Sequence, residues 1–114
     1  MSGTRQVEDK AGNTWVVVES PRYFDGNTGQ KVLDVVKKLV DGGVIRIAFD
    51  MTETQVVNSV GVSRLIEIVE LCDGKAGGVV FCTTRPILLK TFKIMGLLLK
   101  ARQVATIDDI AELD

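Results

Sequence analysis

An apolar run from Val44 to Phe49 lies between two stretches whose apolar residues recur at helical spacing, and this order restricts the possible fold most strongly. The run is apolar except for Arg46, as expected for a strand that is covered on both faces. A position between two helices favours parallel neighbours, because parallel strands are joined by crossover connections. The sequence therefore predicts a central strand in a sheet covered by helices.

The flanking segments predict alternating strands and helices. Trp15–Glu19 is rich in β-branched residues and stops at Ser20-Pro21, which predicts a strand that forms a hairpin with a weaker strand near residues 5–8. Helical spacing over residues 28–40 and 60–72, each followed by glycines, predicts two helices. The later elements that we predict are a strand at 78–82, a helix from Pro86 to near Gly96, an edge strand at 104–106 and a short helix at 107–113.

The predicted order is β-β-α-β-α-β-α-β-α, which indicates an α/β fold with a mixed sheet and helices packed against it. The 114 residues match one domain, 1–114, that buries about two thirds of its unfolded surface. Asp25, Asn27 and Thr28 are the candidate caps of the first helix.

Several residue types and patterns of catalytic sites are absent from the sequence. The chain has no histidine, which excludes serine–histidine and cysteine–histidine nucleophile pairs and histidine-ligated metals. Gly74-Lys75 lacks the pattern of a phosphate-binding loop. The spacing of Cys72 and Cys82 fits neither a metal site nor a redox pair, so we interpret them as buried, inert thiols. We expect no catalytic residue, metal or cofactor, and interpret Asp50 and Glu53 as surface acids; an enzyme of unknown type is an alternative.

Charge and hydropathy indicate a protein partner in the cytoplasm. Fourteen basic and fifteen acidic residues give a net charge of −1, which offers no general attraction to nucleic acid or to a membrane surface. No apolar run approaches the ~20 residues of a membrane helix, and the segment Met1–Gln6 does not resemble a secretory signal. We interpret the basic residues of the last third as a solvated helix face: Arg85, Lys90, Lys93, Lys100 and Arg102.

The segment Asn58-Ser59-Val60-Gly61 places a serine hydroxyl at a predicted helix start. The N–H groups of a first helical turn lack intrahelical partners and form the positive end of the helix dipole, so a phosphate on Ser59 would find donors there. The other interpretation is that Ser59 only caps the helix. Ser63, Thr52 and Thr54 are alternative phosphate acceptors, and Ser63, one helical turn after Ser59, is the first of these alternatives.

Four motifs, taken in their order along the chain, resemble the STAS domain, the fold of bacterial anti-sigma factor antagonists. They are Phe24-Asp25 before the first helix, the strand exit Phe49-Asp50-Met51, the segment Asn58-Ser59-Val60-Gly61, and the helix from Pro86 to Gly96. In the family, an Asp-Ser-Ser-Gly motif stands where this chain has Asn58 to Gly61. The resemblance extends along nearly the whole chain.

The resemblance implies a non-catalytic regulator that binds an anti-sigma factor of the serine kinase type. It also implies that phosphorylation of Ser59 switches the regulator off. It implies a partner-binding surface of Asp25, Asn58, Ser59, Val60 and Gly61. Asn58 and Val60 replace the aspartate and the second serine of the family motif. These two departures favour the alternative, a constitutive binding or scaffold module of a signalling or transport assembly.

Two contact regions are left open by the sequence. A homodimer through the edge hairpin is one option. Leu97-Leu98-Leu99 holds more apolar residues than one helix face buries, so it forms either a turn in the core or, in part, an exposed contact patch.

Overall fold

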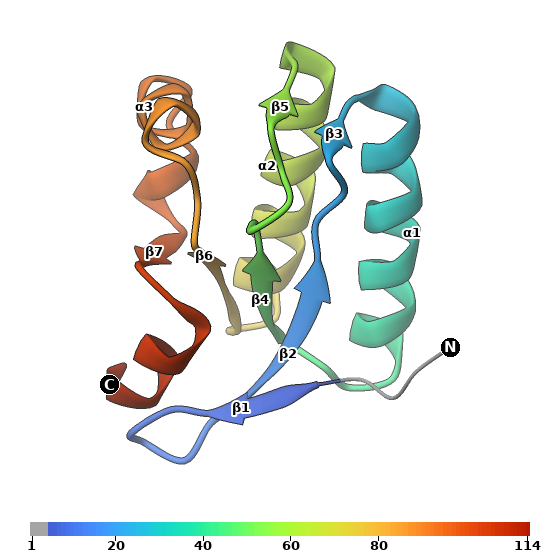
Figure 1. Ribbon diagram of the computed structural model, residues 1–114. Helices are drawn as coiled ribbons and strands as arrows, with labels where there is room; N and C mark the ends of the chain where they lie inside the picture. Colours follow the sequence, from blue (N-terminus) through green and yellow to red (C-terminus); the bar gives the residue numbers. More distant parts are fainter. Residues whose placement is uncertain (1–4) are drawn as a thin grey trace.

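The computed structural model describes residues 5–114, which form a five-stranded mixed sheet (Figure 1). β1 (Gln6–Glu8) is antiparallel to β2 (Thr14–Glu19), while β2, β4 (Arg46–Asp50), β6 (Gly78–Cys82) and β7 (Arg102–Val104) are parallel. The strand order is β1-β2-β4-β6-β7, so the predicted central position of the strand after Val44 is confirmed. Residues 1–4, part of the N-terminal segment considered in the sequence, lie outside the described residues.

Three α-helices connect the parallel strands, which confirms the α/β fold class. They are α1 (Gly26–Asp41), α2 (Ser59–Gly74) and α3 (Pro86–Ile94), and α3 begins at Pro86 as predicted. Two 3₁₀ segments follow, η1 (Leu97–Leu99) and η2 (Ile107–Glu112). Within residues 5–114, each helix is too short or too polar to cross a membrane.

The structure corrects the predicted elements at three places. The last helix, η2, has 3₁₀ and not α geometry, and the edge strand β7 begins two residues earlier than predicted. The prediction also lacked two short strands, β3 (Tyr23–Phe24) and β5 (Val56–Val57), which pair in parallel as a separate small sheet. The observed order therefore contains two strands more than the predicted one.

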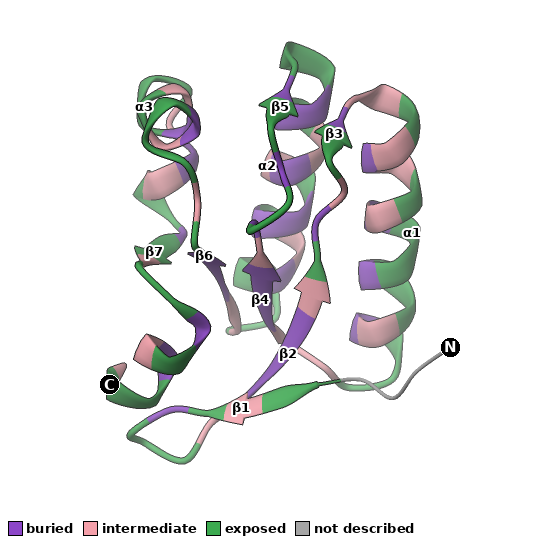
Figure 2. Cartoon of the chain, in the orientation of Figure 1, coloured by how far each residue is buried: buried purple, intermediate pink, exposed green. Residues whose placement is uncertain are grey.

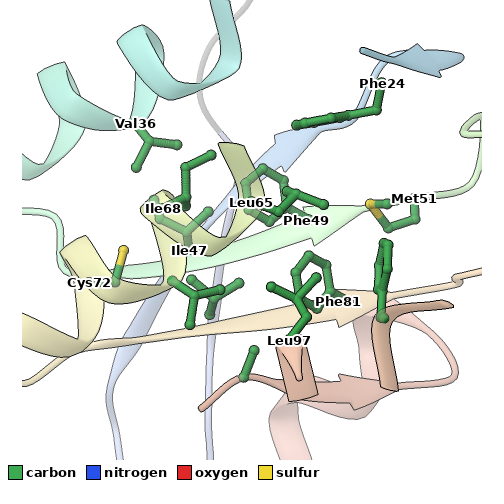
Figure 3. Close-up of a cluster of buried hydrophobic side chains, with 14 of the residues drawn as sticks. Phe24, Val36, Ile47, Phe49, Met51, Leu65, Ile68, Cys72, Phe81 and Leu97 are labelled. Atoms are coloured by element: carbon green, nitrogen blue, oxygen red, sulfur yellow. The ribbon is translucent and has the colours of Figure 1, made fainter. Parts of the chain in front are cut away.

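The main hydrophobic core lies between the helices and one face of the sheet (Figure 3). The buried positions of α1 lie on the side toward α2 (Figure 2), and Phe49, Phe81 and Phe92 pack with ring centroids 5.7 and 5.1 Å apart. Leu97 belongs to this core, whereas Leu99 is 86% exposed. The leucine run is therefore divided between a core turn and a solvent-exposed position.

A second hydrophobic cluster covers the opposite face of the sheet. Alternate residues of the strands, such as Trp15, Ala48 and Val80, pack there against Ile107 and Ile110 of η2. Side chains alternate between the faces of a strand, so β4 contributes Ile47 and Phe49 to one cluster and Ala48 to the other. The apolar sequence of β4 follows from this burial on both sides.

The turn of the β1–β2 hairpin is organised around the Asp9 carboxylate. It accepts hydrogen bonds from the backbone N–H of Ala11 (3.0 Å) and Asn13 (2.9 Å), and from the Trp15 indole Nε1–H (2.9 Å). The Trp15 hydrogen bond is the largest cause that lowers the pKa of Asp9 below its ordinary value of 3.8. Asp9 therefore joins the turn to the second hydrophobic cluster through Trp15.

Gly77 lies against the backbone of Ile45 where α2 returns to the sheet. A Cβ atom at Gly77 would lie 1.7 Å from the Ile45 carbonyl oxygen, whereas a Cβ atom at Gly74 would meet nothing within 4 Å. The first position therefore excludes any side chain, and the second accepts one.

We predict opposite effects of the same substitution at these two glycines. Gly77→Ala should lower the free energy of unfolding by about 1–3 kcal/mol or more, because backbone must move to admit the methyl group. Gly74→Ala, the matched control, should raise it by about 0.4–1 kcal/mol, because alanine restricts the unfolded chain and suits a helix. Urea unfolding measures both values, and similar losses in the two variants would contradict the described packing.

We predict that Asp9→Asn lowers the melting temperature near neutral pH. An amide has one acceptor oxygen, so it cannot replace a carboxylate that accepts hydrogen bonds from the turn and from the Trp15 indole N–H. The folded-state pKa of Asp9 is lowered, so its contribution is present above the unfolded-state value and disappears as the pH falls through the folded-state value. The difference between wild type and variant should therefore shrink below about pH 3.8. Thermal melts from pH 7 to 2 test this, with Glu8→Gln as the control at an exposed neighbouring position; a difference that is constant with pH would contradict it.

Candidate functional site

The small β3–β5 sheet brings the starts of α1 and α2 together. Phe24 and Val57 are paired in register, so the residues that follow them, Asp25 and Asn58, leave the two strands side by side. The Asn58 N–H donates to the Phe24 carbonyl (3.1 Å). Each of the two residues then becomes the N-cap of a helix.

Asp25 caps α1 through a reciprocal pair of hydrogen bonds with Thr28. The Thr28 N–H donates to the Asp25 carboxylate (2.9 Å), and the Asp25 N–H donates to the Thr28 hydroxyl (2.9 Å). The Thr28 backbone hydrogen bond is the largest cause that lowers the pKa of Asp25. The half-buried Asp25 thus holds the α1 start in place, beside the predicted site residue Asn58.

Asn58, and not Ser59, caps α2. The Asn58 side-chain oxygen accepts a hydrogen bond from the Gly61 N–H (2.8 Å), and Ser59 is the first residue of the helix. The interpretation of Ser59 as a helix cap is therefore wrong. Its side chain is exposed, and its hydroxyl makes no hydrogen bond within the described part of the chain.

Gly61 lies beneath the exposed residues of the predicted site. A Cβ atom there would lie 2.1 Å from the Phe24 carbonyl oxygen, so the first turn of α2 reaches this position only with glycine. Gly61 is buried, in contrast to Asn58, Ser59 and Val60. It can therefore shape a partner-binding surface but not contact a partner through a side chain.

Half-exposed apolar side chains occur next to Ser59 in the chain and in the small β3–β5 sheet that leads into α2. Val60 is 47% exposed, and its Cγ1 would lie 3.1 Å from a Cβ atom at Gly26, at the start of α1. Tyr23 and Val56, cross-strand neighbours in β3 and β5, are also about half exposed. We call Tyr23, Val56, Asn58, Ser59 and Val60 the Ser59 surface.

Sequence reasoning missed Tyr23 and Val56. Each precedes a buried residue, Phe24 and Val57, in the alternation that is typical of a strand. Two residues are too few for this alternation to be recognised as a pattern. A signal for these positions exists only once the pairing of the two segments is known.

The alternative phosphate acceptors differ in accessibility. Thr54 is fully buried, and its hydroxyl is hydrogen bonded to Ser20 (2.7 Å) and donates to the Pro21 carbonyl (2.8 Å). Thr52 is exposed and bound to Asp50, and the exposed Ser63 hydroxyl donates to the Ser59 carbonyl (3.2 Å). Among these serines and threonines, Ser59 alone is exposed with an unengaged hydroxyl in the described chain.

Asp50 is the last residue of β4, and Glu53 lies in the turn that follows this strand. They line a hollow of about 230 Å³ together with Glu19, Ser20 and Thr52. Residues 5–114 contain no group of three histidine, cysteine or acidic side chains that would hold a metal ion. The hollow brings acidic and hydroxyl side chains together, and the Thr52 hydroxyl in it donates to the Asp50 carboxylate.

Both cysteines are buried, as predicted. Desolvation raises the pKa of Cys72 to about 11 and is the largest cause that raises the pKa of Cys82 to about 12. Thiols with such values are protonated at neutral pH, and the thiolate is the reactive form. Burial and protonation therefore both disfavour reaction of these cysteines in the folded protein.

The chain matches the family model of the STAS domain over residues 5–110. No curated protein sequence matches it. This match covers nearly the whole chain and agrees with the resemblance carried by the four sequence motifs.

The fold is also similar to solved structures of anti-sigma factor antagonists. A Thermotoga maritima protein described as a candidate antagonist has a TM-score of 0.77 at 12% identity, with 94% of this chain and 88% of that chain covered. The phosphorylated form of the Bacillus cell fate determinant SpoIIAA has a TM-score of 0.68 at 16% identity, covering 95% and 96%. A serine-to-glutamate variant of RsbS from Moorella thermoacetica has a TM-score of 0.63 at 22% identity, covering 96% and 92%. The chain belongs to the STAS domain family.

Proposed function

We propose that this STAS domain is a non-catalytic regulator that binds an anti-sigma factor of the serine kinase type through the Ser59 surface. Phosphorylation of Ser59 by that kinase, which supplies ATP and magnesium, releases the complex. In the unmodified state the domain captures the kinase in the cytoplasm and a sigma factor is freed. The observation that carries this proposal is the exposed Ser59 hydroxyl at the first position of α2, where Asn58 performs the capping.

The α2 start suits a phosphate electrostatically. The first turn contains no acidic residue, and its cap is a neutral amide. A phosphate adds about −1.5 to −2 charges, and the positive end of the helix dipole stabilises negative charge at this position. The modified domain is therefore expected to keep its fold.

The apolar surroundings of Ser59 suit a switch in binding. A partner packed on Tyr23, Val56 and Val60 would remove Ser59 from water, so an added phosphate would be desolvated at the contact. Each ~1.4 kcal/mol of such a penalty lowers the affinity tenfold. A penalty of a few kcal/mol therefore suffices to dissociate a regulatory complex.

The relatives support the same function at the level of the fold. SpoIIAA, described as an anti-sigma factor antagonist, has been solved both phosphorylated and unphosphorylated, and both forms resemble this chain. Asn58 and Val60 replace the aspartate and the second serine of the family motif. Of these, Asn58 keeps the capping contact, and Val60 adds apolar surface next to Ser59.

We predict that protein purified from its native cells carries phosphate on Ser59. Trypsin releases the peptide from Ile47 to Arg64, which holds Thr52, Thr54, Ser59 and Ser63, and fragmentation mass spectrometry distinguishes the four positions. Phosphate should be found at Ser59 and not at the buried Thr54. A peptide that is unmodified under all growth and stress conditions would contradict the switch and favour the constitutive binding module.

We predict that Ser59→Asp separates stability from binding. The acidic side chain at the helix start should leave the free energy of unfolding unchanged or raise it by about 0.3–1 kcal/mol. Its affinity for the partner, once that protein has been purified with the wild-type domain as bait, should fall at least about tenfold, a change that corresponds to about 1.4 kcal/mol. Calorimetry of binding and urea unfolding give the two values.

Asn58→Ala and Ser59→Ala are the matched controls. Loss of the cap in Asn58→Ala should cost about 0.5–2 kcal/mol of stability. Ser59→Ala removes a hydroxyl that makes no hydrogen bond in the described chain and should retain both stability and binding. Unchanged partner affinity in Ser59→Asp would place Ser59 outside the interface and refute the proposal.

A further inference from the structure

The exposed apolar side chains form two separate groups. Eight large apolar residues are exposed in residues 5–114, and three of them belong to the Ser59 surface. Four others lie in α3 and η1, namely Ile87, Ile94, Met95 and Leu99. Ile94 is 75% and Leu99 86% exposed, so this second group offers much of its apolar area to solvent.

A groove between α2 and the α3–η1 segment joins this group to α2. It has a volume of about 270 Å³ and an apolar lining from Ile66, Val69, Met95, Leu97 and Leu99. Glu70 and Lys100 also line it. The Lys100 Nζ lies 3.9 Å from an oxygen of the Asp73 carboxylate, so Lys100 has an acidic partner within the same chain.

Two further exposed apolar side chains, Ile87 and Ile94, lie on α3, which ends at the groove residue Met95. Ile87 and Ile94 are seven residues apart, which places them on one side of the helix, and Met95 follows toward the groove. Both isoleucine side chains are mostly exposed. We call Ile66, Ile87, Ile94, Met95 and Leu99 the groove surface.

Opposite charges flank the groove surface. On the α2 side, Glu67 and Glu70 are exposed; on the α3 side, Lys90 and Lys93 are exposed. Glu67 is paired with Arg64 (2.8 Å), whereas Glu70, Lys90 and Lys93 make no ion pair within the described residues. Of the side chains named here that lack an ion pair in the described residues, the one on α2 is acidic and the two on α3 are basic.

We propose that the groove surface is the interface of a homodimer related by a twofold axis. In such an interface every contact occurs twice, because residue i of one copy meets residue j of the other and the reverse. Two copies that cover each other's apolar strip can therefore place the unpaired acid of α2 opposite the lysines of α3 in the other copy. Edges of one charge would repel the same edges of a second copy, whereas Glu70 and the lysines Lys90 and Lys93 carry opposite charges.

The groove surface shares no residue with the Ser59 surface. The dimer therefore requires neither the kinase partner nor phosphorylation, and its failure would leave the proposed function untouched. It also differs from pairing through the β1 edge, the other route to a homodimer.

Measurements of mass in solution test the dimer. Sedimentation equilibrium should give a mass that rises with concentration toward twice the 12.4 kDa of the chain. Leu99→Asp and Ile94→Asp should be monomeric, and Val35→Asp, which changes an exposed apolar residue of α1, should dimerise like wild type. Circular dichroism melts verify that each variant is folded.

Charge reversal tests the orientation of the two copies. Glu70→Lys and Lys90→Glu should each raise the dimer dissociation constant about tenfold, and the variant carrying both changes should recover most of the wild-type value. A monomeric mass at every concentration up to about 1 mM would overturn the dimer. It would mean that the free energy of dimerisation is weaker than about −4 kcal/mol. A dimer that survives Leu99→Asp and Ile94→Asp would overturn its placement in the groove, and capture of a different protein there by a monomeric chain would do the same.

Discussion

The arrangement of the candidate site depends on the contact between the first turn of α2 and the Phe24 carbonyl. Gly61 has no side chain, so the helix start rests directly on the backbone that leads from β3 into α1. The Asn58 N–H donates to the same carbonyl oxygen, and the Asn58 side chain closes the turn by accepting from Gly61. The Phe24 carbonyl therefore contacts both the residue that follows β5 and the first turn of α2, and this places Ser59 at the start of the helix.

The main elements could be predicted from the sequence because their burial patterns are long enough to be recognised. The strand after Val44 is covered on both faces, and α1 and α2 each bury a stripe over four turns. β3 and β5 span only two residues each, so they carry no readable period and were missed. The 3₁₀ geometry of η2 was also not predictable, since its buried residues, Ile107 and Ile110, fit a short α-helix equally well.

The candidate site shows the same limit at the scale of single residues. Asparagine and serine are both good helix caps, so the sequence Asn58-Ser59 does not tell which residue caps α2. The pairing of β5 with β3 decides this, because it brings the Asn58 backbone to Phe24 and leaves Ser59 one residue into the helix. The sequence also placed Gly61 on a binding surface, although this residue is buried. Its burial arises from a contact with Phe24, 37 residues away in the chain, which the local sequence does not reveal.

A net charge of −1 conceals a marked local order of charge and apolar area. The exposed acids of α2 and the exposed lysines of α3 cancel in the total, yet they belong to different helices, one of which lines the groove and the other of which ends at it. α2 contributes to both exposed regions of the domain, with its first turn in the Ser59 surface and its middle in the groove surface. A single helix therefore links two surfaces whose chemistry differs.

The two free cysteines divide between the two faces of the sheet. Cys72 lies in the core under the helices, and Cys82 in the cluster under η2. Burial prevents a thiol reagent from reaching either sulfur until the layer above it opens. The chain therefore contains one natural probe for each layer, and the two alkylation rates report separately how often the helices and the C-terminal segment detach from the sheet.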